Sequence, residues 1–360
     1  MADGIKVGLV LSGGGAKGAY QIGVLKALRE LGARIDAVSG ASIGALNGGI
    51  LASSPSLDVA IARLEDLWGR LAKQSPLKVK TPGYLMLLAA AGLRFQGAGL
   101  ALGAVSAAQR IAHRLGYEVP EWMEFLEDGL LDDNPLKALM DEYLVPEDLE
   151  NGLPLYVSLY KSDGGMADLL AAFMAEVGMA NTPESKFVHI QALASDERKD
   201  ALLASAAIPM LFKARLVSGQ RYSDGGQGGW QTMHGNTPIA PLIEAGCNLI
   251  IVTHLSDGSP WSRQDFAGTT ILEIRPTETL NRATGMLSGS QDLLGFDVEK
   301  IPSWIEQGYR DTKACVGRVM EAQKIRNELR ISEALLKATE QDDTHADKTL
   351  ADAMAALKQT

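Results

Sequence analysis

The sequence is poor in cysteine, in basic charge and in long apolar runs. Its 360 residues include two cysteines, Cys247 and Cys315. Two are too few for a disulfide framework, and this favours a reducing compartment. Acidic residues outnumber basic ones by 44 to 34, which gives a formal net charge of −10. Because an acidic chain does not attract phosphate backbones in general, nucleic acid is not an expected partner.

Apolar runs long enough to span a bilayer are not evident. A spanning helix needs about 20 consecutive apolar residues. The closest stretch, Leu85 to Val105, is interrupted by Arg94 and Gln96. The N-terminus does not show a basic region followed by a long apolar one, so no secretory signal is expected. These observations predict a cytoplasmic protein.

The chain does have a large apolar share, 46% of its residues, which is enough to bury a sizeable core. Strand and helix patterns alternate at the start. Residues 5–11 and 35–39 are short apolar runs typical of strands, whereas 16–31 and 45–53 have helical spacing. Because the order strand, turn, helix occurs twice in succession, it predicts a parallel sheet with helices packed on it.

The rest of the chain extends this pattern around a less regular middle. We predict one domain over residues 1–300 with a helical insertion or lid at about 57–150, and a helical segment over 301–360 packed on it. The expected fold class is α/β, with a mainly parallel central sheet and helices on both faces. Further strands are expected at 153–160, 187–191, 221–224, 248–254 and 270–274, and further helices at 57–73, 199–207 and 238–245.

A tight turn with a glycine-flanked serine follows the second expected strand. It reads Gly40-Ala41-Ser42-Ile43-Gly44. A serine hydroxyl becomes a nucleophile when it is exposed and positioned beside a base, and a sharp strand-to-helix turn exposes it. Small residues on either side let the strand and the helix pack closely. Ser42 is therefore the predicted nucleophile of a serine acyl hydrolase, and the alternative is a glycine-rich turn with an idle serine.

A glycine loop follows the first expected strand and opens a helix. It reads Gly13-Gly14-Gly15-Ala16-Lys17-Gly18 and matches the Gly-x-Gly-x-x-Gly pattern of dinucleotide sites. Asp36 stands near the acidic position that such a site requires, but at the start of its strand. The other use of such a loop is an oxyanion hole, in which the N–H groups of the first three glycines converge on a developing negative charge. Three roles are open for Lys17: it holds the loop by hydrogen bonds, it contacts a phosphate, or it faces solvent.

The base that would activate Ser42 is less obvious. A histidine is the usual partner of a serine nucleophile, and the best-placed ones are His254, at a strand end, and His234. The turn Asp224-Gly225-Gly226 offers an alternative. A carboxylate at a strand end can accept the serine proton directly if the contact is short and well aimed, although Asp-Gly is also a common plain turn. The five histidines are His113, His189, His234, His254 and His345.

Together these motifs resemble those of the patatin-like phospholipase family. The match consists of the glycine loop continued by Ala19-Tyr20, the Ser42 turn and the Asp224 turn. Ser205-Ala206-Ala207-Ile208-Pro209 and Asn236-Thr237-Pro238-Ile239 are similar to the family's flanking segments. The resemblance implies a patatin-like fold and a Ser-Asp dyad, with Ser42 as nucleophile, Asp224 as base and the loop Gly13, Gly14, Gly15 as oxyanion hole.

The resemblance also implies hydrolysis of lipid acyl esters, of phospholipase A or lysophospholipase type, through an acyl-enzyme and with no metal or cofactor. The expected partners are a lipid or lysolipid substrate and, transiently, a membrane surface, and the oligomeric state is left open. Two departures stand out: Lys17 replaces a common arginine, and the stretch from Gly226 to Asn236 is longer than expected. Residues 85–105 form either a buried hairpin or a lid. A nucleotide-binding protein and an inactive lipid-binding scaffold are the alternatives.

Overall fold

The computed structural model divides into two compact units, Met1–Thr312 and Lys313–Thr360. The segment 85–105, for which the sequence predicts a hairpin or a lid, lies outside the described residues. The predicted domain boundary at residue 300 falls inside the first unit. The described residues are 5–73, 78–79, 131–132, 134–144, 146–176, 178–209, 211–280 and 298–357.

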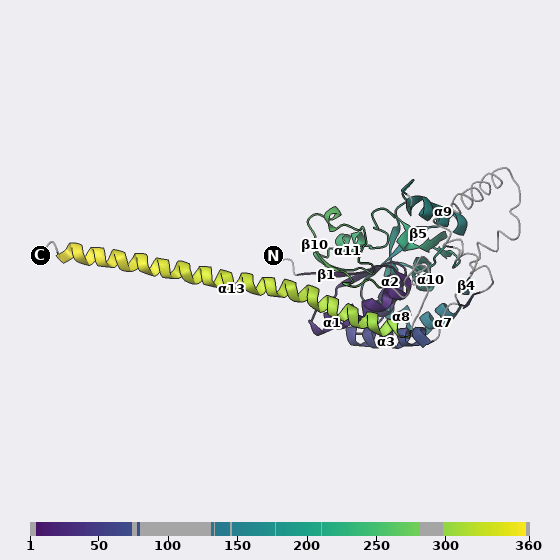
Figure 1. The fold of residues 1–360 in the computed structure, drawn as a ribbon, viewed down its shortest axis with the longest axis horizontal. Helices are drawn as coiled ribbons and strands as arrows, with labels where there is room; N and C mark the ends of the chain where they lie inside the picture. Colours follow the sequence, from purple (N-terminus) through teal and green to yellow (C-terminus); the bar gives the residue numbers. More distant parts are fainter. Residues whose placement is uncertain are drawn as a thin grey trace. The chain divides into compact units, whose positions relative to one another are not determined.

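An eight-stranded sheet forms the centre of the first unit (Figure 1). Its strands lie in the order β10, β9, β1, β2, β5, β8, β7, and β6 pairs with β5. The run from β10 to β5 is parallel throughout, which confirms the predicted α/β fold with a mainly parallel sheet. The bounds are β1 (Val7–Leu11), β2 (Ala37–Gly40), β5 (Leu155–Lys161), β6 (Lys186–His189), β7 (Arg215–Val217), β8 (Gln220–Asp224), β9 (Leu249–Thr253) and β10 (Thr270–Ile274). A separate antiparallel pair joins β3 (Lys78–Val79) to β4 (Leu131–Asp132).

The other edge of the sheet is antiparallel. Ser218 and Gly219 link β7 to β8 and have φ values of 48° and 77°, so both central residues adopt the left-handed conformation of a tight hairpin turn. The turn pairs Val217 with Gln220, and β8 then runs antiparallel to β5. The sequence pattern predicts the end of β8 but not its direction, because strand periodicity carries no information about the neighbouring strand.

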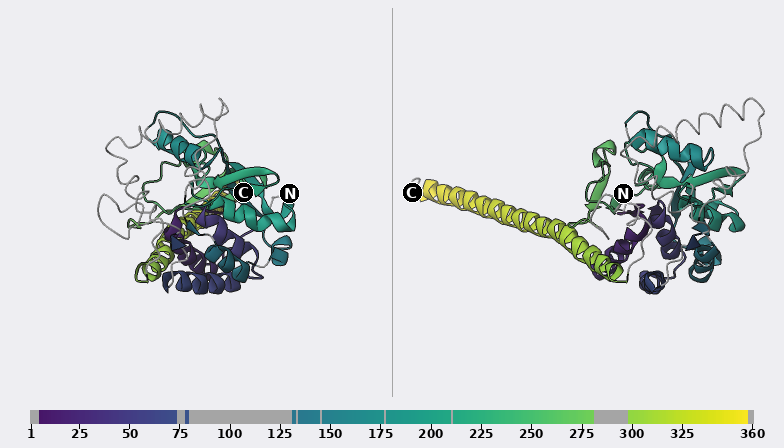
Figure 2. Two further views of the ribbon diagram at one scale, coloured as in Figure 1. Left: turned by 90° about the vertical axis from the view of Figure 1, so that its right-hand side faces the viewer. Right: turned by 45° about the vertical axis from the view of Figure 1, so that its right-hand side comes forward.

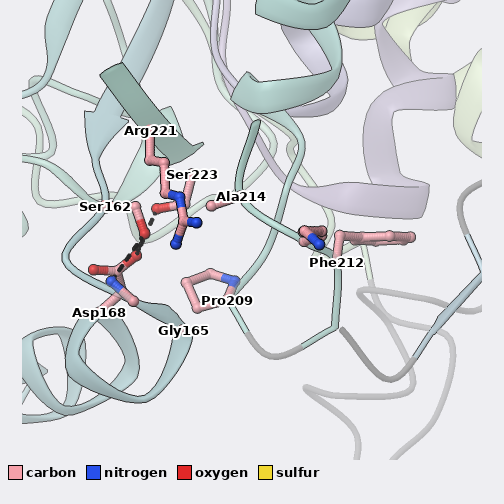
Figure 3. A pocket seen from close by; sticks show the side chains of 10 residues that line it. Ser162, Gly165, Asp168, Pro209, Phe212, Ala214, Arg221 and Ser223 are labelled. Carbon is pink, nitrogen blue, oxygen red and sulfur yellow. Dashed lines mark hydrogen bonds between the residues drawn. The ribbon is translucent and has the colours of Figure 1, made fainter. Parts of the chain in front are cut away.

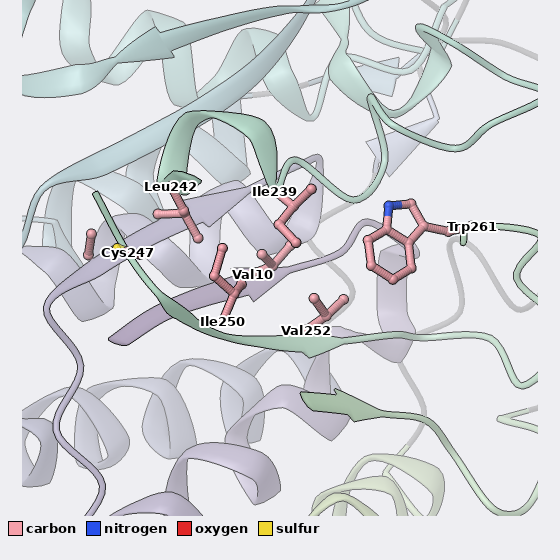
Figure 4. Packing of buried hydrophobic residues seen from close by; sticks show 8 residues of the cluster. Val10, Ile239, Leu242, Cys247, Ile250, Val252 and Trp261 are labelled. Atoms are coloured by element: carbon pink, nitrogen blue, oxygen red, sulfur yellow. The ribbon is translucent and has the colours of Figure 1, made fainter. Parts of the chain in front are cut away.

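Helices cover both faces of the sheet. On one face, α11 (Ala240–Glu244) contributes Leu242 to a buried cluster with Val10, Ile250 and Val252 (Figure 4). On the other face lies α2 (Ile43–Ala52). There, a Cβ placed on Gly48 would lie within 4 Å of side-chain atoms of Leu155, Val38 and Leu11. β1 is buried along its whole length, as expected for a parallel strand covered on both sides.

Further helices of the first unit lie around this core, as the two views in Figure 2 also show. The predicted helix at 57–73 is α3, which packs against α1 and α2. Helices α7 and α8 lie within the predicted helical insertion, for which the sequence pattern sets no individual bounds, whereas α9 is not predicted. The bounds are η1 (Gly15–Gly18), α1 (Ala19–Glu30), α3 (Leu57–Lys73), α7 (Asn134–Tyr143), α8 (Pro146–Glu150), α9 (Gly165–Glu176), η3 (Ile190–Ala192), α10 (Ser195–Ser205), η4 (Gly225–Gln227), η5 (Arg263–Asp265) and α13 (Lys300–Leu357).

The last helix, α13, begins in the first unit. Its opening turns lie against α1 through two glycines: a Cβ on Gly23 would lie 1.8 Å from the Ile305 carbonyl oxygen, and one on Gly308 would lie 2.1 Å from that of Tyr20. Trp304 is buried there. In the second unit the same helix exposes large apolar side chains, such as Leu329. Among the described helices, none is both long and apolar enough to cross a membrane.

Candidate active site

The pairing register of the sheet brings the three predicted motifs to one level. Leu11 of β1 pairs with Gly40 of β2, and Gly40 pairs with Val157 of β5. Two residues further along β5, Leu159 pairs with Asp224. Because residues rise at nearly the same rate along neighbouring strands, the residues two positions past Leu11 and Gly40 reach the level of Asp224. Those residues are Gly13 and Ser42.

The Ser42 turn has the strained geometry that its glycines permit. Ser42 has φ 53° and ψ −125° and is the residue before α2, a backbone conformation that is uncommon for a non-glycine residue. A Cβ on Gly40 would lie 2.5 Å from the Gly44 carbonyl oxygen, and a Cβ on Gly44 would lie 2.0 Å from the Leu11 carbonyl oxygen. The turn can therefore close only with glycine at both positions, and it leaves Ser42 at the positive end of the helix dipole.

Asp224 is the acidic partner of Ser42. It is 7% exposed, and the Ser42 hydroxyl lies near enough to its carboxylate to lower its pKa. The Gly226 N–H donates a hydrogen bond to Asp224 Oδ1 at 2.8 Å. Burial raises the pKa of Asp224 from its ordinary 3.8 to about 6, and the Ser42 hydroxyl and the Gly226 N–H oppose this rise. A carboxyl group with this pKa is ionised at neutral pH but holds a proton readily, as a general base requires.

Ser205 supports the backbone of Ser42, a role that the sequence does not reveal. Its fully buried hydroxyl accepts a hydrogen bond from the Ser42 N–H at 3.0 Å and donates one to the Ser158 carbonyl at 2.7 Å. It thus joins the serine turn to β5, the strand whose Leu159 pairs with Asp224 of β8. The only sequence signal is its place in the segment Ser205 to Pro209, which is similar to a family flanking segment.

The glycine loop lies beside Ser42. A Cβ on Gly13 would lie 3.0 Å from Ser42 Cβ. The Gly13 N–H donates to the Asn236 carbonyl at 3.3 Å, whereas no hydrogen-bond acceptor for the N–H groups of Gly14 and Gly15 is found among the described residues. Gly15 has φ 59°, which glycine adopts without strain. Lys17 is half-buried. The pKa of Asp257 is lowered mainly by a hydrogen bond from Thr279, and the charge of Lys17 lowers it slightly further.

The long stretch after the Asp224 turn packs against residues 181–185. Trp230 N–H donates to Thr182 Oγ1 at 3.0 Å, and Gln231 N–H donates to Asn181 Oδ1 at 3.1 Å. Ser185 Oγ donates to the Gly225 carbonyl at 2.7 Å. Hydrogen bonds with residues 181–185 thus hold this stretch, which is longer than the family pattern.

The histidines considered as alternative bases have other partners. His254 is buried with its Nε2 3.3 Å from Glu273 Oε2 and its ring tilted against Trp261. Burial lowers the pKa of His254, although Glu273 opposes this. His234 Nε2 lies 3.1 Å from Asp265 Oδ2. Within the described part of the chain, neither ring has a hydrogen bond to Ser42.

A separate cavity of about 240 Å³ lies at the antiparallel edge of the sheet, and none of the predicted site residues lines it (Figure 3). Asp168 is buried there and accepts hydrogen bonds from Ser162 Oγ at 2.6 Å, Ser223 Oγ at 2.9 Å and the Asp163 N–H at 3.0 Å. Burial raises the pKa of Asp168, and these hydrogen bonds oppose the rise. With three donors on this carboxylate, the cluster ties α9 to β8. Among the described residues, no group of three or more His, Cys, Asp or Glu could hold a metal ion.

The chain belongs to the patatin-like phospholipase family, because it matches the family described as Patatin-like phospholipase over residues 9–243. This range contains the glycine loop, the Ser42 turn and the Asp224 turn. The family predicted from these motifs is therefore confirmed.

Curated relatives match a short part of the chain. It is 51% identical over 65 residues to Patatin-like phospholipase domain-containing protein ZK370.4 of Caenorhabditis elegans, which covers 18% of this chain and 5% of that protein. It is 47% identical over 68 residues to Lysophospholipase nte1 of Aspergillus terreus, which covers 19% of this chain and 4% of that protein. Among solved structures, VipD from Legionella pneumophila aligns at 16% identity and a TM-score of 0.35, over 87% of this chain and 67% of that chain. The chain thus spans a small part of the length of the curated relatives.

Proposed function

We propose that this protein is a serine hydrolase of lipid acyl esters that uses Ser42 as nucleophile and Asp224 as general base. The observation that carries the proposal is that the sheet register brings Ser42 to the level of Asp224, where its hydroxyl faces the buried carboxylate and lowers its pKa. A serine at a strained, helix-capping turn has few structural reasons to face such a group. Membership of the patatin-like phospholipase family supports a lipid as the substrate.

The mechanism has two steps. Ser42 Oγ attacks the ester carbonyl carbon while Asp224 takes its proton, and the tetrahedral intermediate collapses to an acyl-enzyme as Asp224 gives that proton to the leaving alcohol. Water then attacks the acyl-enzyme, Asp224 takes the water proton, and Ser42 recovers it as the fatty acid leaves. The N–H groups of Gly14 and Gly15, which have no acceptor among the described residues, are suited to bind the oxyanion, whereas the Gly13 N–H already has the Asn236 carbonyl as acceptor.

The nucleotide-binding alternative has less support. A dinucleotide site needs an acidic residue at the carboxyl end of the second strand to hold the ribose. Asp36 lies at the opposite end, where its carboxylate accepts the Val7 N–H at 2.8 Å and pairs with Arg34 at 2.7 Å. Asp36 and the glycine loop therefore lie at opposite ends of the strands.

A fluorophosphonate probe tests the proposal directly. It should label the wild-type chain and not Ser42→Ala, because only an activated serine reacts at an appreciable rate. A panel of phosphatidylcholine, lysophosphatidylcholine and an aryl butyrate should then reveal which ester is cleaved fastest by the wild type. The Ser223→Ala variant serves as a matched control, since Ser223 lies next to Asp224 but bonds to Asp168 instead. If the wild type is neither labelled nor active on any of these esters, the proposal is wrong.

A further inference from the structure

Asn236 makes a two-point contact with the glycine loop. Its backbone carbonyl accepts the Gly13 N–H at 3.3 Å, and its side-chain Nδ2 donates to the Gly13 carbonyl at 3.4 Å. The two residues are far apart in the sequence, so this contact fixes the start of the loop from outside it. Because Gly13 also adjoins Ser42, a shift of Gly13 would alter the distance from the following N–H groups to the serine.

The amide of Asn236 also stands between the glycine loop and the Asp224 turn. Its Oδ1 lies 2.5 Å from the place of a Cβ on Gly13 and 2.7 Å from the place of a Cβ on Gly226. Asp224 Oδ1 lies 3.0 Å from that same point beside Gly226. The two glycines thus leave the space that the Asn236 amide fills, and this amide lies close to the Asp224 carboxylate.

The next two residues anchor Asn236 to the ends of the central strands. Thr237 Oγ1 and Ser12 Oγ lie 3.0 Å apart in a buried hydrogen bond. Ser39 Oγ donates to the Pro238 carbonyl at 2.5 Å. Segment 236–238 is therefore tied to both strands just before their functional turns, which holds Asn236 in a fixed place.

We propose that Asn236 is a positioning residue that sets the distance between the glycine loop and the Ser42–Asp224 pair. The inference rests on the proposed function for its catalytic consequence, but its structural part does not. Asn236 does not act on the substrate. It holds Gly13, so that the N–H groups of Gly14 and Gly15 face Ser42, and it packs against the turn that orients the Asp224 carboxylate.

Hydrogen exchange of the full-length chain tests the structural part. In Asn236→Ala, the amides of residues 12–18 should exchange about 10-fold faster, because the loop loses its side-chain anchor. Asn181→Ala is the matched control, since Asn181 also holds a backbone N–H near this region but does not touch Gly13 or Gly226. Unchanged exchange at residues 12–18 would overturn the inference even if the chain had no hydrolase activity.

Kinetics on the preferred ester test the catalytic part. Asn236→Ala should lower kcat about 10-fold to 100-fold with KM within about 2-fold, because misplaced donors weaken the transition state more than substrate binding. Asn181→Ala should leave both unchanged. An active wild type whose kcat is kept by Asn236→Ala would refute the inference and leave the proposed function intact, whereas a wild type that is neither labelled nor active on any of the esters would refute the proposed function.

Asn236→Asp supplies a readout that a structural role alone would not move. The Asp224 carboxyl faces the Ser42 hydroxyl and the Gly226 N–H, and no charged side chain among the described residues contributes to its pKa. A new carboxylate in the place of the Asn236 amide would repel a charge on Asp224, so the acid limb of kcat should move up by about one pH unit. The two side chains have the same shape, so the variant should keep its fold. An unmoved acid limb would contradict the placement of Asn236 beside Asp224.

Discussion

The parallel and antiparallel parts of the sheet contribute to the candidate site in different ways. β1 and β2 each end in a turn whose shape is set largely by neighbouring residues, the glycine loop and Gly40 to Gly44. β8 carries Asp224 to the same level through its antiparallel pairing with β5. The proposed nucleophile is thus shaped by its own turn, whereas the position of the proposed base depends on the register of a distant strand.

Removing the proposed base without moving its strand should change the activity most. Asp224→Asn keeps the shape of the side chain and the Gly226 contact but cannot accept the Ser42 proton. The rate of ester hydrolysis should fall by a factor of about 10³ or more. Fluorophosphonate labelling and the far-ultraviolet circular dichroism spectrum provide the readouts. If the variant kept most of its activity, the antiparallel half of the sheet would not supply the base.

The pH dependence of the rate tests the contribution of the antiparallel part of the sheet in a second way. Because burial raises the pKa of Asp224 to about 6, the rate should fall about 10-fold per unit as the pH drops below 6, where the base is protonated. Rates of the wild type between pH 4.5 and 8.5 check this. An acid limb near the ordinary pKa of 3.8 would show that Asp224 is more hydrated than its burial indicates.

The same raised pKa affects stability. In the unfolded chain Asp224 ionises near its ordinary 3.8, but in the folded chain only near 6. The folded state thus binds more protons between these values, and stability falls as the pH rises through this window and stays lower above it. Asp224→Asn should remove this loss, which is on the order of 3 kcal/mol. Urea unfolding of both chains at pH 4 and pH 8 should show a larger drop for the wild type.

A smaller effect on activity is expected at Ser205, which links the Ser42 turn to β5. Ser205→Ala removes the hydroxyl that links the Ser42 N–H to the Ser158 carbonyl of β5. The variant should lose about 10-fold in kcat and about 1–3 kcal/mol in stability, because two buried polar groups lose a partner. Ser53→Ala, in which a buried hydroxyl bonded to the Ile50 carbonyl is lost far from the site, is the matched control and should keep its kcat.

The smallest effect is expected at His254. His254→Gln removes the ring that contacts Glu273 and Trp261 but touches no part of the Ser42–Asp224 pair. The activity should stay within about 2-fold of the wild type, with a modest loss of stability from the core. A loss comparable to that of Asp224→Asn would restore a histidine base and overturn the dyad.

Several features of the site could be predicted from local sequence. Gly40 and Gly44 indicate the serine turn because a Cβ at either position would clash with the backbone. Apolar runs such as Leu249–Thr253 indicate buried strands. The direction of β8 could not be predicted, since its hairpin with β7 depends on the backbone conformation of Ser218 and Gly219. Ser205 and Asn236 could not be assigned either, because their partners lie in distant parts of the chain.

The family, the α/β pattern and the glycine-flanked turn that holds Ser42 could be predicted from short windows of neighbouring residues. The folded chain was needed to show that the Asp224 carboxylate, which the family resemblance implies as base, faces Ser42, and that the Gly13 N–H differs from those of Gly14 and Gly15 in having the Asn236 carbonyl as acceptor. These depend on strand register and on hydrogen bonds between segments hundreds of residues apart. Burial is likewise a property of the folded chain, and burial gives Asp224 a pKa of about 6.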